Sequence, residues 1–274
     1  MTENQTQKRI FELDALRGIA VIAMIIDHFT YLLFEFYIMT PEIFSNFGKI
    51  NPVGFRKIVN VLVEFQLSSF RDGAHYVFCT IFLLLVGISC TFSKNNLLRG
   101  LKVGIGAAII SVATIIISLV IKDNYSIIFG ILHLICVSIL LFYLVQKLYP
   151  NKWLYLIIGS FLIIWGFLIK WWDAPFIGDY RTITFVDLFK IILGYKVYGA
   201  DHFGIIPCTG VVFVGAFLGE LLYKKRQTLF PKLDKAWHKP FTYVGRHALL
   251  IYLFHQVVSI VVIVLMFLLA GYRF

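Results

Sequence analysis

Long uninterrupted apolar runs constrain this chain more than any other feature of its sequence. A membrane interior about 30 Å thick requires roughly 20 apolar residues per helix, and the sequence supplies such runs repeatedly. Of its 274 residues, 59% are hydrophobic and only 15% are charged. Transmembrane β-strands would instead alternate apolar and polar residues. The sequence therefore predicts an all-α, polytopic transmembrane helical bundle.

We expect about seven spans within one integral membrane domain, residues 1–274. The spans fall at roughly 11–34, 74–93, 101–121, 125–147, 153–170, 203–223 and 247–271. The stretch 184–198 mixes apolar residues with charged ones, which favours an interfacial or re-entrant helix. Small residues let helix backbones approach each other, and we expect this at Gly104, Gly106, Gly210, Gly215 and Gly219.

The distribution of basic residues indicates the orientation of the bundle, because positively charged loops stay in the cytoplasm. A cytoplasmic N-terminus and an outside C-terminus would put the whole formal charge of +10 on the cytoplasmic side. Anionic membrane lipid is a sufficient partner for that charge, so no nucleic acid is expected. The chain is predicted to be a multi-pass protein of the cell membrane.

The first predicted span carries ionisable residues inside "LDALRGIAVIAMIIDH", Leu13 to His28. On a helix, Arg17 and His28 return to within roughly 20° of one face, and Asp14 lies about 40° from His28. Asp14 and Arg17 are three residues apart and can form an ion pair. Asp27 points about 100° away from His28, so we expect it to bind another helix or a substrate hydroxyl.

Ionisable side chains at membrane depth cost several kcal/mol, so by default they mark a functional path. A histidine has a reference pKa near 6.5 and can take a proton from an attacking hydroxyl or amine, which would make His28 a general base. A structural alternative is that Asp14 and Arg17 anchor the helix end while His28 hydrogen-bonds a neighbouring helix.

The stretch "RIFELDALRGIAVIAMIIDH" resembles the first helix of the catalytic domain of the heparan-α-glucosaminide N-acetyltransferase family and its bacterial relatives. Its arginine–histidine spacing is also similar to that of the acyltransferase-3 group. Four further stretches resemble the bacterial members in order and spacing: "FRDGAHYVFCTIFLLLVGIS", "IIFGILHLICVSIL", "DHFGIIPCTGVVFVGAFLG" and "GRHALLIYLFHQ". Together they cover most of the chain.

The resemblance implies an acyltransferase that moves an acyl group, usually acetyl, from cytoplasmic acetyl-CoA to a sugar on the far side of the membrane. Acetyl-CoA is then the co-substrate, an extracytoplasmic carbohydrate is the acceptor, and no metal is expected. We expect His28, with Asp27 beside it, to activate the acceptor. The resemblance places the family's catalytic histidine after the first span, which makes His75 the second candidate for the base.

The donor is strongly anionic, so basic residues on the cytoplasmic side are candidate contacts for its phosphates. We expect Arg17, paired with Asp14, and Arg246 to take part in binding it. His133 lies inside a predicted span, where it either lines the donor channel or hydrogen-bonds between helices.

An alternative function belongs to another class of protein. Intramembrane Asp27, His28, His133 and His255 could form the proton relay of a secondary transporter or exporter. Transporters commonly contain two repeated halves, and no internal repeat is visible in this sequence.

The four cysteines lack the spacing typical of a metal site and are expected to be buried apolar residues: Cys79, Cys90, Cys136 and Cys208.

Overall fold

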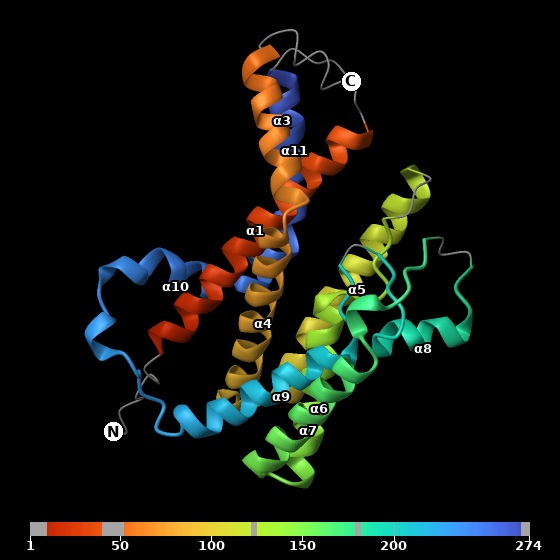
Figure 1. Ribbon diagram of the computed structural model, residues 1–274. Coiled ribbons are helices and arrows are strands. Elements are labelled where there is room, and N and C mark those ends of the chain that lie inside the picture. The colour runs from red at the N-terminus through yellow and green to blue at the C-terminus, as the bar shows by residue number, and fades with distance from the viewer. Residues whose placement is uncertain (1–9, 40–51, 122–124, 179–181, 200, 270–274) are drawn as a thin grey trace. The chain divides into compact units, whose positions relative to one another are not determined.

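A computed structural model describes residues 10–39, 52–121, 125–178, 182–199 and 201–269. The described residues are mostly helical and form no β-strand, which confirms the predicted all-α bundle (Figure 1). Its helices are α1 (Phe11–Met39), α3 (Pro52–Gln66), α4 (Ser69–Phe92), α5 (Asn96–Ile121), α6 (Ile131–Leu148), α7 (Lys152–Leu168), α8 (Phe185–Leu193), α9 (Ile205–Leu222), α10 (Lys239–Arg246) and α11 (Ala248–Leu269).

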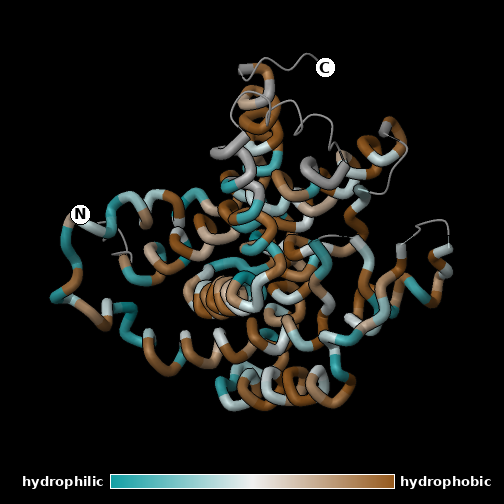
Figure 2. The backbone as a smooth tube through the Cα atoms, turned by 45° about the horizontal axis from the view of Figure 1, so that its top comes forward, coloured by the Kyte–Doolittle hydropathy of each residue, from teal (hydrophilic) through white to brown (hydrophobic). Residues whose placement is uncertain are grey.

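Within the described ranges, six helices are long and apolar enough to cross a membrane: α1, α4, α5, α6, α9 and α11. Helix α7 is also apolar but has only 17 residues. Figure 2 shows the apolar residues distributed along these helices. Each of the seven predicted spans therefore corresponds to a helix, and the protein is an integral membrane protein.

Some helix boundaries differ from the prediction for a local reason. The span expected from residue 125 begins only at Ile131. The backbone N–H of Tyr125 donates to Ser118 Oγ at 2.9 Å, and that of Ile127 donates to Thr114 Oγ1 at 3.1 Å. Side chains of α5 therefore hold residues 125–127 against that helix. The backbone N–H groups of Tyr125 and Ile127 have hydrogen-bond partners there, so these residues need not be part of a helix.

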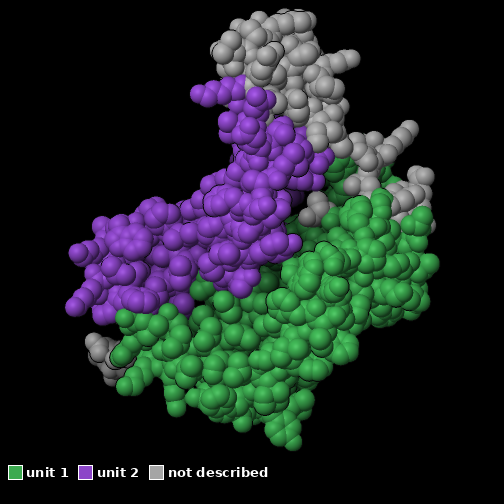
Figure 3. Space-filling view, in the orientation of Figure 1, with its two compact units in different colours: residues 1–10, 83–229 green, residues 11–82, 230–274 purple. Residues whose placement is uncertain are grey.

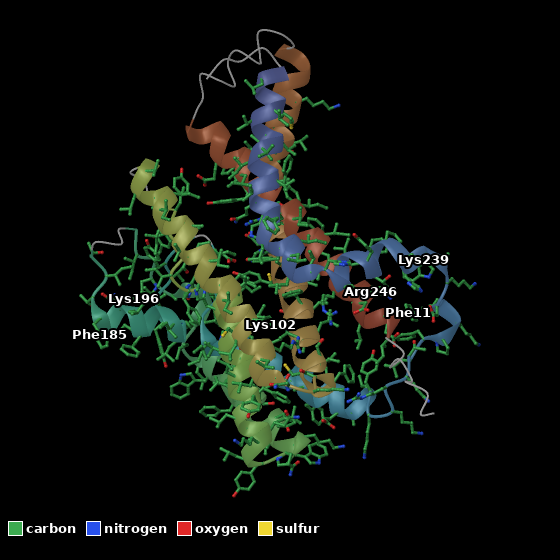
Figure 4. All side chains as sticks on the ribbon, turned by 180° about the vertical axis from the view of Figure 1, so that it is seen from behind. Phe11, Lys102, Phe185, Lys196, Lys239 and Arg246 are labelled. Atoms are coloured by element: carbon green, nitrogen blue, oxygen red, sulfur yellow. The ribbon has the colours of Figure 1, made fainter. Side chains whose placement is uncertain are left out.

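Helix α8 lies where the interfacial or re-entrant helix was expected. Thr184 and Asp187 form a capping box at its start, and Gly194 ends it with a φ of 97°. Lys196 Nζ donates to Asp187 Oδ1 at 2.6 Å, and this contact, with the Thr184 hydrogen bonds, lowers the pKa of that carboxyl to about 2. Figure 4 labels Lys196 and Phe185 at this helix.

The described residues form two compact units, coloured separately in Figure 3. Unit 1 comprises residues 1–10 and 83–229, and unit 2 comprises residues 11–82 and 230–274. Helices α5, α6, α7 and α9 pack together in unit 1. In unit 2, α1 packs against α3, α10 and α11. Most of the predicted site residues therefore belong to unit 2.

Close helix packing at glycines, expected from the sequence, is present in unit 1. A Cβ atom on Gly210 of α9 would lie 2.7 Å from the Gly159 carbonyl oxygen of α7, too close for any side chain. Similar crowding would occur at Gly104, where Cys136 Sγ lies 2.9 Å from the Cβ position. Such contacts allow the close packing of α5 on α6 and of α7 on α9.

Candidate active site

The N-terminal end of the α1 face that carries Asp14, Arg17 and His28 is an ion-pair cluster. Arg17 Nη1 donates to Asp14 Oδ1 at 2.9 Å, as the three-residue spacing predicted. Arg246 Nε of α10 donates to the other oxygen of that carboxylate at 3.4 Å. The Arg246 side chain is 45% exposed, and Figure 4 shows it at the end of α10. Two guanidinium groups therefore contact one carboxylate, which makes them candidate contacts for an anionic ligand.

Two glycines allow α10 to approach α1 at this cluster. A Cβ atom on Gly18 would overlap the Phe241 carbonyl oxygen, and one on Gly245 would overlap that of Asp14. These glycines belong to "LDALRG" and "GRHALL", two of the stretches singled out in the sequence. The segments cross at backbone contact, which brings Arg246 to Asp14.

Asp27 lies on another face of α1 and binds α4. Arg71 Nε donates to Asp27 Oδ1 at 2.6 Å, and Arg71 Nη2 donates to Oδ2 at 3.1 Å. His75 Nδ1 is 3.1 Å from the same Oδ2. The side chains of all three residues are mostly shielded, with exposed fractions of 13% to 27%. The Asp27 carboxylate thus forms a bidentate ion pair with Arg71 and orients the His75 imidazole. Of the two partners expected for Asp27, another helix or a substrate hydroxyl, the structure shows another helix.

The other ring nitrogen of His75 faces a thiol. Its Nε2 lies 3.7 Å from Sγ of Cys79, one helical turn further along α4. Of the four cysteines expected to be buried, Cys79 and Cys90 are, whereas Cys136 and Cys208 are only half-buried. Cys79 is also in polar contact with an imidazole. His75 therefore has a polar neighbour at both ring nitrogens.

His28 packs against the last helix of the chain. Its Nδ1 is 3.0 Å from Nε2 of His255 in α11, and the ring centroids are 4.9 Å apart. Nδ1 of His255 is 2.5 Å from the Tyr252 carbonyl oxygen. No described residue forms a hydrogen bond with Nε2 of His28. That nitrogen can therefore accept a proton from a ligand.

The two groups of side chains meet on α1 and form one cluster. Asp27, which binds Arg71 and His75 of α4, is adjacent in sequence to His28, which contacts His255 of α11. The cluster combines a carboxylate, a guanidinium and three imidazoles within membrane-spanning helices. Such a set can take up a proton and stabilise developing charge, which are the two requirements of transfer to a hydroxyl or amine.

A family described as heparan-alpha-glucosaminide N-acetyltransferase, catalytic, matches residues 9–55 and 55–257. The chain belongs to this family. No curated protein and no solved structure was found to match it. Membership makes the protein a membrane acetyltransferase, and every residue of the cluster lies inside the matched segments of this heparan-alpha-glucosaminide N-acetyltransferase catalytic domain.

His133, expected either to line a donor channel or to bridge helices, belongs to unit 1 of this acetyltransferase. Its Nδ1 accepts from the Gly130 backbone N–H at 3.2 Å, and its Nε2 lies 3.1 Å from Ser111 Oγ. That hydroxyl in turn donates to the Ile127 carbonyl at 2.7 Å. Both ring nitrogens are engaged, so a donor contact through this ring would have to displace one partner.

Sequence reasoning missed two partners in the acetyltransferase cluster. Arg71 was not recognised as the partner of Asp27, although its position one turn before His75 places both on one face of α4. His255 was considered only as part of a transporter relay. The position of His255 inside a predicted span indicated a functional role. Its contact with His28, however, joins residues 227 positions apart and follows from tertiary packing, which the sequence pattern does not show.

A polar hollow of about 340 Å³ lies in unit 1 of the acetyltransferase. It is lined by Gln146, Pro150, Asn151, Lys152, Tyr155 and Glu220. None of the predicted site residues lines it, so chemistry and pairing geometry, rather than cavity size, identify the candidate active site.

Proposed function

We propose that this protein transfers an acetyl group from acetyl-CoA to a hydroxyl or amine of an extracytoplasmic sugar, with His28 as the general base. The observation that carries the proposal is the state of the His28 ring. Its Nδ1 is held by His255, whereas its Nε2 has no hydrogen-bond partner among the described residues. A base needs such an unengaged lone pair facing its substrate.

In the proposed reaction, His28 Nε2 takes the proton of the acceptor as the acceptor oxygen or nitrogen bonds to the acetyl carbonyl carbon. The carbon–sulfur bond of the thioester breaks, and the electron pair leaves with the sulfur. The proton then passes from His28 to the thiolate or to water, which restores the neutral ring. Arg71 is bound to Asp27, the residue next to His28 in the sequence, and in the proposal it stabilises the negative charge on the carbonyl oxygen.

Arg17 and Arg246 are the proposed contacts for the donor. Both contact Asp14, and Arg17 lies about three helical turns from His28, roughly 16 Å along α1 at 1.5 Å per residue. With the predicted orientation in the cell membrane, this end faces the cytoplasm, where acetyl-CoA is made available, and His28 faces the outside. The pantetheine arm of CoA would have to span that separation.

His75 is the second candidate for the base. Asp27 fixes its orientation in the manner of a carboxylate that supports a catalytic histidine. Cys79 occupies the opposite ring nitrogen, however, so His75 offers its lone pair less readily than His28 does. In the proposal, Asp27 and His75 therefore act as charged or polar neighbours of His28 and not as the base itself.

The test is an assay of CoA release from acetyl-CoA by the full chain in lipid nanodiscs, with a panel of amino sugars and polysaccharide fragments. We expect His28→Ala to abolish acceptor-dependent release, whereas His75→Ala retains part of it. His247→Ala is the matched control because this histidine of unit 2 is exposed and lies outside the cluster. Full activity in His28→Ala would refute the proposed base. Proton-coupled sugar flux in liposomes without CoA release would favour the transporter alternative.

A further inference from the structure

We infer that His255 is a positioning residue that fixes the tautomer of His28, so that the lone pair of the base lies on Nε2. The inference rests on the proposed function, because it concerns how His28 becomes a base. It depends on which atoms can donate and which can only accept a hydrogen bond: the Tyr252 carbonyl oxygen and the two ring nitrogens of His255.

The proton positions follow from the Tyr252 carbonyl. A carbonyl oxygen can only accept a hydrogen bond, so His255 Nδ1, 2.5 Å away, must carry the proton. A neutral imidazole has one proton, which leaves His255 Nε2 as an acceptor. His28 Nδ1, 3.0 Å from that acceptor, must then be the donor. The remaining nitrogen of His28, Nε2, therefore bears the lone pair.

His255 sets this tautomer of His28 only while its own ring is neutral. A second proton on that ring would turn Nε2 into a donor and reverse the polarity of the pair, which would leave His28 with its proton on Nε2. A charged ring at this depth is disfavoured because His255 is only 6% exposed and lies within a membrane-spanning helix. No described carboxylate contacts it to compensate such a charge.

The pair also supports His28 after it collects a proton. With Nε2 protonated, His28 still donates its Nδ1 proton to the lone pair of His255 Nε2, 3.0 Å away, and this hydrogen bond stabilises the positive charge on the His28 ring while His255 stays neutral. His255 thus acts through His28 and does not need to touch substrate.

His133 provides an internal comparison because its partners require the opposite tautomer. The Gly130 N–H can only donate, so His133 Nδ1 must bear the lone pair. Its proton therefore lies on Nε2 and is donated to Ser111 Oγ. One chain should contain two half-buried histidines, His28 and His133, with opposite tautomers that their hydrogen-bond partners determine.

Nitrogen NMR of the full chain in nanodiscs, labelled with ¹⁵N-histidine, distinguishes protonated from bare ring nitrogens. We expect a protonated Nδ1 and a bare Nε2 for His28, and the reverse for His133. The signals are assigned by their loss in His28→Gln and in His133→Gln. A protonated Nε2 on His28 in the wild-type protein would overturn the inference, and this measurement requires no variant of His255 to fold.

The second readout is kinetic. His255→Phe keeps an aromatic ring but removes the acceptor, so we expect kcat to fall about 10- to 100-fold with an unchanged KM for acetyl-CoA. His255→Gln supplies an acceptor oxygen and should recover part of the loss. Wild-type kcat in folded His255→Phe would overturn the positioning role. Failure of the proposed function is recognised separately, because it appears as full activity in His28→Ala whatever tautomer the NMR spectrum reports.

Discussion

Gly245 of α10 lies against Gly18 of α1, with only 3.0 Å between its Cβ position and the Gly18 backbone nitrogen. This contact joins a segment near the start of the chain to one near its end. It also determines where Arg246 meets Asp14, and hence the position of the proposed donor site.

The glycine crossing predicts a sharp sensitivity to a single methyl group. Gly245→Ala places that methyl group against the Asp14 carbonyl, and the backbone cannot give way without separating the helices. We expect the free energy of unfolding to fall by about 1–3 kcal/mol, or more if α10 detaches. Thermal unfolding of the purified protein in detergent measures the change. Gly73→Ala is the control, since its Cβ would meet nothing within 4 Å, and an equal loss there would contradict the prediction.

The Asp27–Arg71 pair predicts strong non-additivity. Arg71→Leu leaves a shielded carboxylate without its bidentate partner, and we expect a loss of about 3–5 kcal/mol. Adding Asp27→Asn removes the uncompensated charge and should recover a large part of that loss. The coupling is obtained from unfolding of the two single variants and the double variant. Additive effects would mean that the two side chains do not stabilise each other.

The proposed donor site predicts a selective effect on substrate binding. Arg246→Gln removes one charge-assisted contact, so we expect KM for acetyl-CoA to rise about tenfold with little change in kcat. Lys224→Gln is the matched control, because that lysine is exposed and belongs to the general positive charge expected on the cytoplasmic side. Equal effects of both variants would indicate a nonspecific role of charge.

From the burial of His202 we expect the free energy of unfolding to fall on mild acidification. Burial lowers the pKa of this histidine from 6.5 to about 4, against the opposing effect of its hydrogen bond to the Phe129 backbone. Between these values the unfolded chain binds a proton that the folded chain does not, so stability falls as the pH drops from about 6.5 towards about 4. The loss is on the order of 2–3 kcal/mol. Thermal unfolding at about pH 7 and about pH 5 should show a smaller pH difference in His202→Phe than in the wild type.

Helical periodicity predicted a large part of the fold and the faces of α1. The apolar runs located the six described helices that are long enough to cross a membrane and the shorter apolar helix α7, and the 100° step separated the Asp14–His28 face from Asp27. Those two faces do contact different helices, with Asp14 and His28 reaching α10 and α11, and Asp27 reaching α4. Local geometry was sufficient here because a helix fixes the directions of its own side chains.

Helices α3 and α10 and the partners of the site residues could not be predicted in this way. "PVGFRKIVNVLVEFQ" and "KPFTYVGR" contain too many polar residues for an apolar run, so their helices depend on packing against α1. The same holds for His255, whose role depends on how α11 is rotated against α1. Periodicity gives the direction in which a side chain points but not which residue lies there.

The contact between His28 and His255 has a consequence for biosynthesis. The partner of His28 in α1 belongs to α11, so the ribosome must finish α11, and the insertion machinery must release it, before the pair can form. Nascent chains and products of premature termination would carry His28 without its counterpart, and on our proposal they would be inert towards acetyl-CoA.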